Sequence, residues 1–113
     1  MSETHAERRP LQIPCTLEVP GAIPLYGQTR ELSDREASLQ SANLAVPNIR
    51  KPKTGDAGVL TLSARAHLAQ REPLKIPCRV AHVIGTIVGV QLNLVGLNSR
   101  QRATFAALLG SER

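Results

Sequence analysis

The sequence is poor in aromatic residues. Tyr26 and Phe105 are its only aromatic side chains apart from histidine, and Trp is absent. Proteins that bind single-stranded nucleic acid stack bases on aromatic side chains in addition to attracting the phosphates with positive charge. With so few stacking platforms, a basic nucleic-acid-binding barrel is the third and least favoured class of function, despite a formal net charge of +5.

Cysteines and long apolar runs are also scarce. The two cysteines, Cys15 and Cys78, together with an N-terminus that lacks a charged-then-apolar leader, favour a reducing, cytoplasmic location over a disulfide scaffold. No apolar run approaches the roughly 18 residues that a membrane-spanning helix requires. We therefore expect a cytoplasmic protein with no membrane span.

Signals for catalysis and for metal binding are weak. Nucleophilic catalysis needs a Ser or Cys beside a His base and an orienting acid. Cys78 and His82 are expected on an apolar inner face, where a free Cys behaves as a small hydrophobe. The sequence has no CxxC or HxxxH pair and no glycine-rich phosphate loop. We expect no enzyme activity, no metal site and no cofactor.

What the sequence does contain is enough aliphatic material for one core. Its 113 residues are 42% apolar, which predicts a single folded domain with a core of Val, Leu, Ile and Ala. The positive net charge and a pI of about 10.0 favour anionic partners.

Short stretches of alternating apolar and polar residues predict β-strands separated by turns. In the fifth stretch, the alternation places Ile76, Cys78, Val80, His82 and Ile84 on the inner face. Six such stretches predict an all-β domain with one helix, built as a small antiparallel barrel. The expected strands are Ile13–Val19, Tyr26–Leu32, Ala37–Ala42, Val59–Leu68, Ile76–Ile84 and Val88–Leu94.

The C-terminal segment, at about residues 98–110, predicts a short amphipathic helix. Asn98 or Ser99 can cap its start, Phe105 and Leu108 contribute to an apolar stripe, and Gly110 supplies a stop. We expect this helix to pack on the barrel or close an open end, with Phe105 as its main anchor.

Two polar segments remain. The loop Val46–Asp56 contains Arg50, Lys51 and Lys53, and such charge runs are more often solvated than functional. The polar turn Ser33–Glu36 sits between the second and third strands, where Ser33 can hydrogen-bond the local backbone.

The polar turn is either a solvated corner or half of a binding site. Arg8 and Arg9 precede the first strand, and arginines offer planar donor forks to phosphates and guanine edges. A hydroxyl and a carboxylate from the turn would complete the recognition of a purine. The alternative is a solvated N-terminal arm and an ordinary polar turn.

The sequence resembles the PilZ domains, bacterial modules that bind cyclic di-GMP. The resemblance covers roughly residues 7–109 and rests on the order and spacing of short segments within the strand pattern. These segments are the Arg-rich lead-in with Ile13-Pro14-Cys15, Glu31-Leu32-Ser33, Lys53-Thr54-Gly55-Asp56, Ile87-Val88-Gly89-Val90-Gln91-Leu92 and the terminal helix.

The resemblance implies a six-stranded antiparallel PilZ-like β-barrel over residues 10–113, with a C-terminal α-helix and a flexible arm at residues 1–9. The family's RxxxR motif becomes Arg8 to Gln12 here, so Gln12 replaces the second arginine and Arg9 is a possible substitute. In the family's [D/N]xSxxG motif, Ser33 matches, Glu31 replaces the shorter acid, and Glu36 replaces the glycine.

By this resemblance, Arg8 and Arg9 clamp the phosphates and bases of cyclic di-GMP, while Glu31 and Ser33 read a guanine edge. The implied function is a cyclic di-GMP receptor, weakened by these departures from the motifs, that relays the signal to an unidentified effector protein. Glu36 would place a negative charge near a dianionic ligand, and it removes a glycine where positive φ or close approach is useful. The alternative function is therefore a PilZ-like adaptor that binds no nucleotide and acts through protein contacts, for example in motility or surface attachment.

Overall fold

The computed structural model describes residues 12–63 and 73–110. The arm at residues 1–9, with Arg8 and Arg9, therefore lies outside the described residues. So does the second half of the expected fourth strand, from Ala64 to Leu68.

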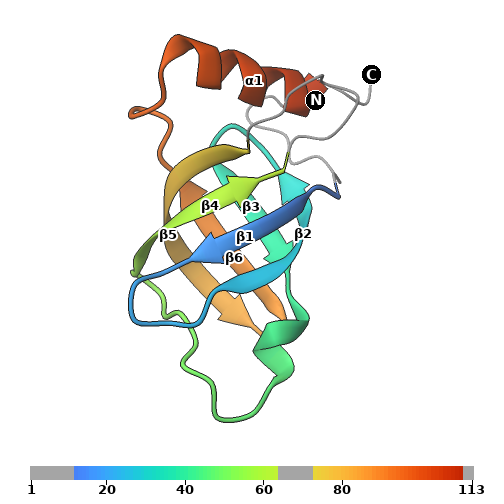
Figure 1. The fold of residues 1–113 in the computed structure, drawn as a ribbon, viewed down its shortest axis with the longest axis vertical. Coiled ribbons are helices and arrows are strands. Elements are labelled where there is room, and N and C mark those ends of the chain that lie inside the picture. The colour runs from blue at the N-terminus through green and yellow to red at the C-terminus, as the bar shows by residue number, and fades with distance from the viewer. Residues whose placement is uncertain (1–11, 64–72, 111–113) are drawn as a thin grey trace, which may run out of the picture.

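The described chain forms a closed six-stranded barrel with one α-helix, as the sequence predicted. Every pair of neighbouring strands is antiparallel, and the order around the barrel is β1-β2-β3-β6-β5-β4, with β4 pairing back to β1. The helix α1 lies across one end of the barrel, and the 3-10 helix η1 lies at the other end (Figure 1). In chain order the elements are β1 (Pro14–Glu18), β2 (Leu25–Leu32), β3 (Glu36–Gln40), η1 (Ala42–Ala45), β4 (Ala57–Leu62), β5 (Leu74–Ile84), β6 (Ile87–Leu92) and α1 (Ser99–Gly110).

The interior of the barrel is aliphatic. Alternate residues of each strand point inward, and in β1 the buried residues are Cys15 and Leu17, followed by Val19 just after the strand. Leu25, Leu39, Leu60, Ile76 and Val88 meet them from the other strands and are completely buried. Burying each such side chain stabilises the fold by about 1.5–3 kcal/mol. These inward positions follow the alternation of apolar and polar residues in the sequence of the first strand.

The second half of β5 contradicts the expected alternation. A register shift between Val80 and His82, in the pairing of β5 with β6, inserts an extra residue at Ala81. A β-bulge of this kind turns the following residues over. His82 is therefore exposed, Ile84 is 67% exposed, and Val83 packs against the core instead. The prediction that His82 and Ile84 point inward was wrong.

The third strand is shorter than expected at its C-terminal end, because Ser41 starts a helical turn. The buried Ser41 side chain accepts a hydrogen bond from the Asn43 N–H at 3.3 Å and donates to the Tyr26 carbonyl at 2.8 Å. These bonds begin η1 at Ala42, where the sequence had predicted the end of a strand. The fourth strand, β4, ends at Leu62, and the described Ser63 lies outside it.

The helix α1 begins and packs as its sequence predicted. The Asn98 side chain accepts from the Gln101 N–H at 2.8 Å, and the Gln101 side chain accepts from the Asn98 N–H at 2.9 Å. This reciprocal capping box satisfies two backbone donors that a helix start leaves without intrahelical partners. Phe105 and Leu108 are buried in the core cluster, so Phe105 anchors the helix as expected.

Candidate functional site

The turn between β2 and β3 is held by Ser33. This side chain is only 2% exposed. Its hydroxyl accepts from the backbone N–H groups of Arg35 at 3.2 Å and Glu36 at 3.1 Å, and donates to the Glu36 carbonyl at 3.3 Å. The Ser33 N–H donates to the same carbonyl at 2.9 Å. Ser33 therefore fixes the shape of this corner from inside it.

Glu31 reaches the outer face of the barrel through a second bulge. The register of β2 with β3 shifts between Thr29 and Glu31, so Arg30 and Glu31 are both exposed while Thr29 and Leu32 are buried on either side. In a regular strand, the side chain of either Arg30 or Glu31 would point into the barrel, because successive side chains point to opposite faces. The bulge places a cation and a carboxylate next to each other beside the corner.

Gln12 lies close to the same part of β2. The residue after it, Ile13, accepts from the Thr29 N–H at 2.9 Å through its carbonyl and donates its own N–H to the Thr29 hydroxyl at 2.9 Å. The chain that leads into β1 thus runs beside β2 where Arg30 follows. Of the residues implied by the resemblance, Glu31, Ser33 and Glu36 meet at the corner and its outer face, whereas Gln12 is placed only through Ile13, which bonds Thr29.

Glu36 occupies the position where the motif has glycine, and its backbone is not strained. Among the described residues, Asn48 is the one non-glycine residue with positive φ. Glu36 is instead the first residue of β3, with its side chain exposed. Any effect of Glu36 on a ligand would therefore come from its charge and size, and not from a backbone conformation that requires glycine.

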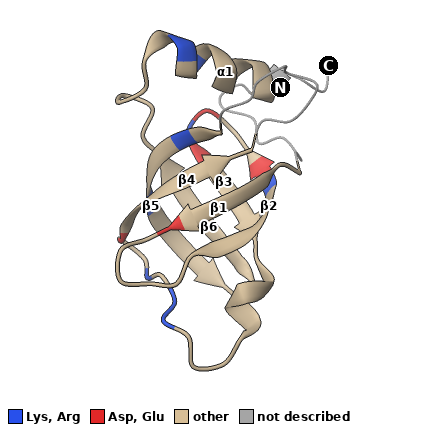
Figure 2. Ribbon diagram, viewed as in Figure 1, with Lys and Arg blue, Asp and Glu red and all other residues tan. Residues whose placement is uncertain are grey.

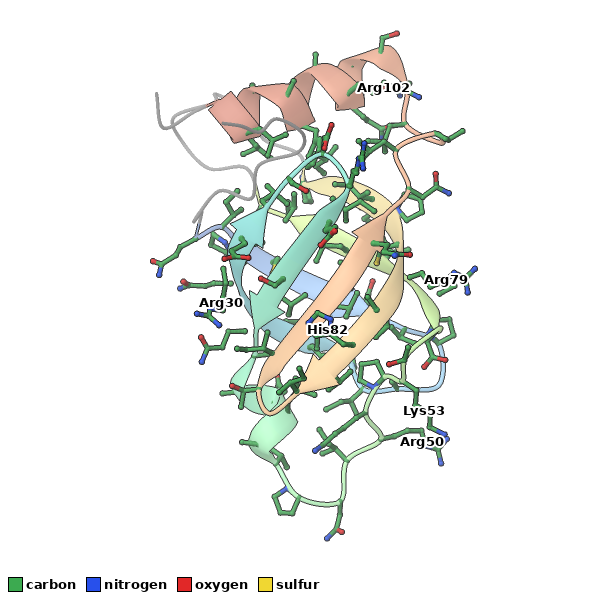
Figure 3. All side chains as sticks on the ribbon, turned by 180° about the vertical axis from the view of Figure 1, so that it is seen from behind. Arg30, Arg50, Lys53, Arg79, His82 and Arg102 are labelled. Atoms are coloured by element: carbon green, nitrogen blue, oxygen red, sulfur yellow. The ribbon has the colours of Figure 1, made fainter. Side chains whose placement is uncertain are left out.

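A hollow of about 400 Å³ lies on the outer face of β2, β3, β6 and β5. We call it the first hollow. Its floor runs across the strands through Ser38, which pairs with Gly89, which in turn pairs with His82. Arg30, Glu31, Glu36, Ile87 and Gln91 also line it. Figure 3 views this side of the barrel, with His82 near its middle and Arg30 at the edge near β2.

His82 lies directly on Gly89. A Cβ atom on Gly89 would come within 2.5 Å of His82 Nε2 and 2.8 Å of Nδ1, and closer still to Cε1. The absence of a side chain at Gly89 thus leaves room for the imidazole, and the bulge at Ala81 brings the imidazole to this face. His82 remains exposed, so the ring presents a planar surface to the first hollow.

Arg30, His82 and Gly89 were not predicted from the sequence as residues of this candidate site. Alternation extended through β5 put His82 inside the barrel, and Arg30 falls between motif positions. One signal was present: Gly89 interrupts the β-branched run of Ile87, Val88 and Val90, and a glycine inside a strand often marks a bulge or the close approach of another group.

Both cysteines are buried in the barrel core. Burial raises the pKa of the Cys15 thiol to about 12 and that of Cys78 to about 11, so both are protonated at neutral pH. Neither thiol is an activated nucleophile, since the reactive form is the thiolate.

Two kinds of feature are absent from the described residues. Within residues 12–63 and 73–110, no group of three or more His, Cys, Asp or Glu side chains is placed to hold a metal ion. Over the same described residues, no helix is long and apolar enough to cross a bilayer.

Comparisons with known proteins identify the fold. No protein-family model and no curated protein sequence matches the chain. Among solved structures, the PilZ domain of CeSA from a cellulose-synthesizing bacterium superposes with a TM-score of 0.69 at 19% identity, over 95% of this chain and 99% of that one. The Bacillus subtilis inhibitor of motility MotI/DgrA gives 0.68 at 6% identity, over 99% of this chain and 52% of that one. The chain therefore adopts a PilZ-like fold, a closed six-stranded antiparallel barrel with one C-terminal helix.

Proposed function

We propose that the protein is a non-enzymatic cyclic di-GMP receptor that acts in the cytoplasm and relays the signal to an effector protein. The first hollow would hold the ligand. Arg8, Arg9 and Arg30 would attract the phosphates, because guanidinium groups form charge-assisted hydrogen bonds with phosphate oxygens. Glu31 would accept hydrogen bonds from a guanine edge, Ser33 would hold the corner in shape, and the His82 ring would pack against a base.

The observation that carries this proposal is the convergence at the first hollow. Glu31 and Glu36, which the resemblance to PilZ motifs selects, line it together with Arg30 and His82, which that resemblance does not select. The chain uses two bulges to present Arg30, Glu31 and His82 there. Bulges are frequent next to binding sites, where they redirect a side chain.

Isothermal titration of the full chain with cyclic di-GMP tests the proposal, with cyclic di-AMP as a control of the same charge and a different base. We expect heat of binding and a rise in melting temperature with cyclic di-GMP and much weaker effects with cyclic di-AMP. No heat and no shift in melting temperature at high micromolar ligand would remove the receptor function.

Two variants locate the binding site. Arg30→Ala should weaken binding by about tenfold or more, because a hydrogen bond to a charged group contributes about 1.5–3 kcal/mol. The matched control is Arg100→Ala, which removes an exposed arginine from α1 and should leave the affinity unchanged. Glu36→Gly should strengthen binding, because it removes a carboxylate from the wall of a site for a dianion.

The second candidate function is an adaptor with a PilZ-like fold that binds no nucleotide. Two observations favour it: the Ser33 hydroxyl already makes three hydrogen bonds within the corner, and two carboxylates line the first hollow. Gln12 also lacks the guanidinium of the family motif. If the wild-type chain and Glu36→Gly both ignore cyclic di-GMP, this second function replaces the first.

A further inference from the structure

A second hollow lies on the opposite side of the barrel from the first. It measures about 540 Å³ and sits between the end of β1, the turn that follows it, and the start of β4. In the barrel order, β1 and β4 lie across from β3 and β6, which carry the first hollow. Its lining is mostly small and apolar, with Val19, Pro20, Ala22, Pro24, Ala57 and Val59.

The second half of the loop between η1 and β4 borders this second hollow and is fixed in place. Near the middle of the loop, the Arg50 carbonyl accepts from the Ile23 N–H at 3.0 Å. At the end that leads into β4, Gly55 N–H donates to the Val80 carbonyl and Val80 N–H donates to the Asp56 carbonyl, both at 2.8 Å. Arg79 Nη1 also donates to the Gly55 carbonyl at 2.6 Å. The loop is therefore a fixed rim of the second hollow.

This rim is basic. Arg50, Lys51 and Lys53 are exposed on the loop, and Arg79 is exposed on β5 directly opposite Ala57 in the strand register. Figure 2 shows the cationic segments of the loop, and in Figure 3 Arg50, Lys53 and Arg79 project from the same side of the barrel.

Two carboxylates lie nearby and reduce the positive charge only in part. Glu18 lines the second hollow. Asp56 accepts the Lys53 N–H at 2.9 Å through its carboxylate, which therefore turns toward its own loop. The rim thus has four cationic side chains and only two carboxylates nearby, so its net charge is positive.

We propose that the second hollow and its basic rim form a docking site for a segment of a partner protein in which apolar side chains are flanked by Asp or Glu. Apolar side chains of the segment would fill the hollow, since burying apolar surface drives association. Its carboxylates would face Arg50, Lys53 and Arg79, which would fix its register and speed its encounter.

Other occupants fit this surface less well. A single-stranded nucleic acid would meet the basic rim, but it would find no aromatic platform among the residues that line the hollow. A second copy of the chain joined through the same surface would set one basic rim against another. The second hollow lies opposite the first hollow, and the proposed docking does not depend on whether the protein binds cyclic di-GMP.

Peptide selection with the full chain tests the proposal. A displayed library of short random peptides is selected on the immobilised protein at physiological salt, and the enriched peptides are then synthesised. We expect enriched sequences that combine acidic and apolar residues. Their binding should shift the backbone amide signals of residues 18–24 and 57–59 in NMR spectra.

A charge-reversed variant and its matched control give the decisive comparison. Arg50→Glu/Lys53→Glu should weaken the enriched peptides by at least about tenfold. Both residues take part in the described hydrogen bonds of the loop only through backbone atoms, so the fold should persist, as melting curves would show. Lys75→Glu/Arg100→Glu changes the net charge equally at exposed positions outside this rim and should leave the affinity within about twofold.

Ala57→Trp tests the apolar half of the site, and it alters no charge. The indole should fill the second hollow and thereby abolish peptide binding. The proposal is overturned if no acidic and apolar sequences are enriched, or if the charge-reversed variant binds them as well as its control does. It is also overturned if an oligothymidylate binds the rim while the peptides do not, or if Ala57→Trp dissociates a homodimer detected by sedimentation.

Discussion

The substitution of glycine by alanine can be compared at two positions of the barrel, Gly27 and Gly89, which have different neighbours. A Cβ atom at Gly27 would lie 2.8 Å from the Gln40 carbonyl carbon and 3.1 Å from Ser41 Cα, and closer still to the Gln40 carbonyl oxygen. All of these are backbone atoms at the end of β3 and in the residue that follows it. Gly27→Ala can therefore be accommodated only if β2 and the end of β3 move apart.

The cost of this separation can be worked out from its parts. Overpacking costs about 1–3 kcal/mol. The bond from the Ser41 hydroxyl to the Tyr26 carbonyl lies beside the clash, and losing it adds about 1 kcal/mol. The reduced entropy of the unfolded chain offsets about 0.4–1 kcal/mol. We expect Gly27→Ala to lower the free energy of unfolding by about 1–3.5 kcal/mol, with a central value of about 2 kcal/mol, which corresponds to roughly 4–15 °C in melting temperature.

Gly89→Ala should behave differently, because the new Cβ would meet only the ring of His82, an exposed side chain that can swing outward. We expect the free energy of unfolding to change by no more than about 1 kcal/mol. The cost of a strained His82 rotamer opposes the gain from replacing glycine, which is unfavourable inside a strand, by alanine. Urea unfolding followed by circular dichroism measures both variants, since the chain has no Trp to report by fluorescence. Equal losses in the two variants, or no loss in Gly27→Ala, would refute the reasoning.

Four further predictions concern the helix, the corner and the thiols. Phe105→Ala should cost about 3–5 kcal/mol of unfolding free energy and release α1 from the barrel, seen as faster amide hydrogen exchange in the helix. Asn98→Ala removes one half of the capping box and should cost about 1 kcal/mol, measured by urea unfolding. Ser33→Ala should cost about 1–3 kcal/mol with no ligand present, because the partly buried N–H groups of Arg35 and Glu36 lose their hydrogen-bond acceptor. Burial raises the pKa values of Cys15 and Cys78 to about 12 and about 11, whereas the unfolded chain ionises near 9.0. Stability should therefore fall as the pH rises from about 9 toward 12, and Cys15→Ala/Cys78→Ala should show a smaller alkaline loss in urea midpoints.

The strands that line the core were predictable from the sequence, because their side chains follow a strict period of two. Cys15, Leu17 and Val19 are buried and alternate with the more exposed Thr16 and Glu18, and the capped C-terminal helix has its own period and a clear start at Asn98. These are local patterns of apolar residues, and they survive in the fold because nearly every inner position is filled by an apolar side chain.

The bulges were not predictable, and they determine the candidate site. The sequence around His82 and Ile84 continues the apolar alternation of β5, so only the pairing with β6 reveals the extra residue at Ala81. The same holds for Arg30 and Glu31 in β2, where the shift depends on the register with β3. Register between strands is a tertiary property, and a single strand does not encode it locally.

Closure of the barrel limits how any partner can bind. Because β1 pairs with β4, each of the six described strands has hydrogen-bonded neighbours on both sides, and none of them offers an open edge. A partner therefore cannot add its own strand to these six, which is a common way for sheets to recruit peptides and to aggregate. Recognition must pass through side chains on the outer surface, so single substitutions there can alter partner choice and leave the backbone of the barrel intact.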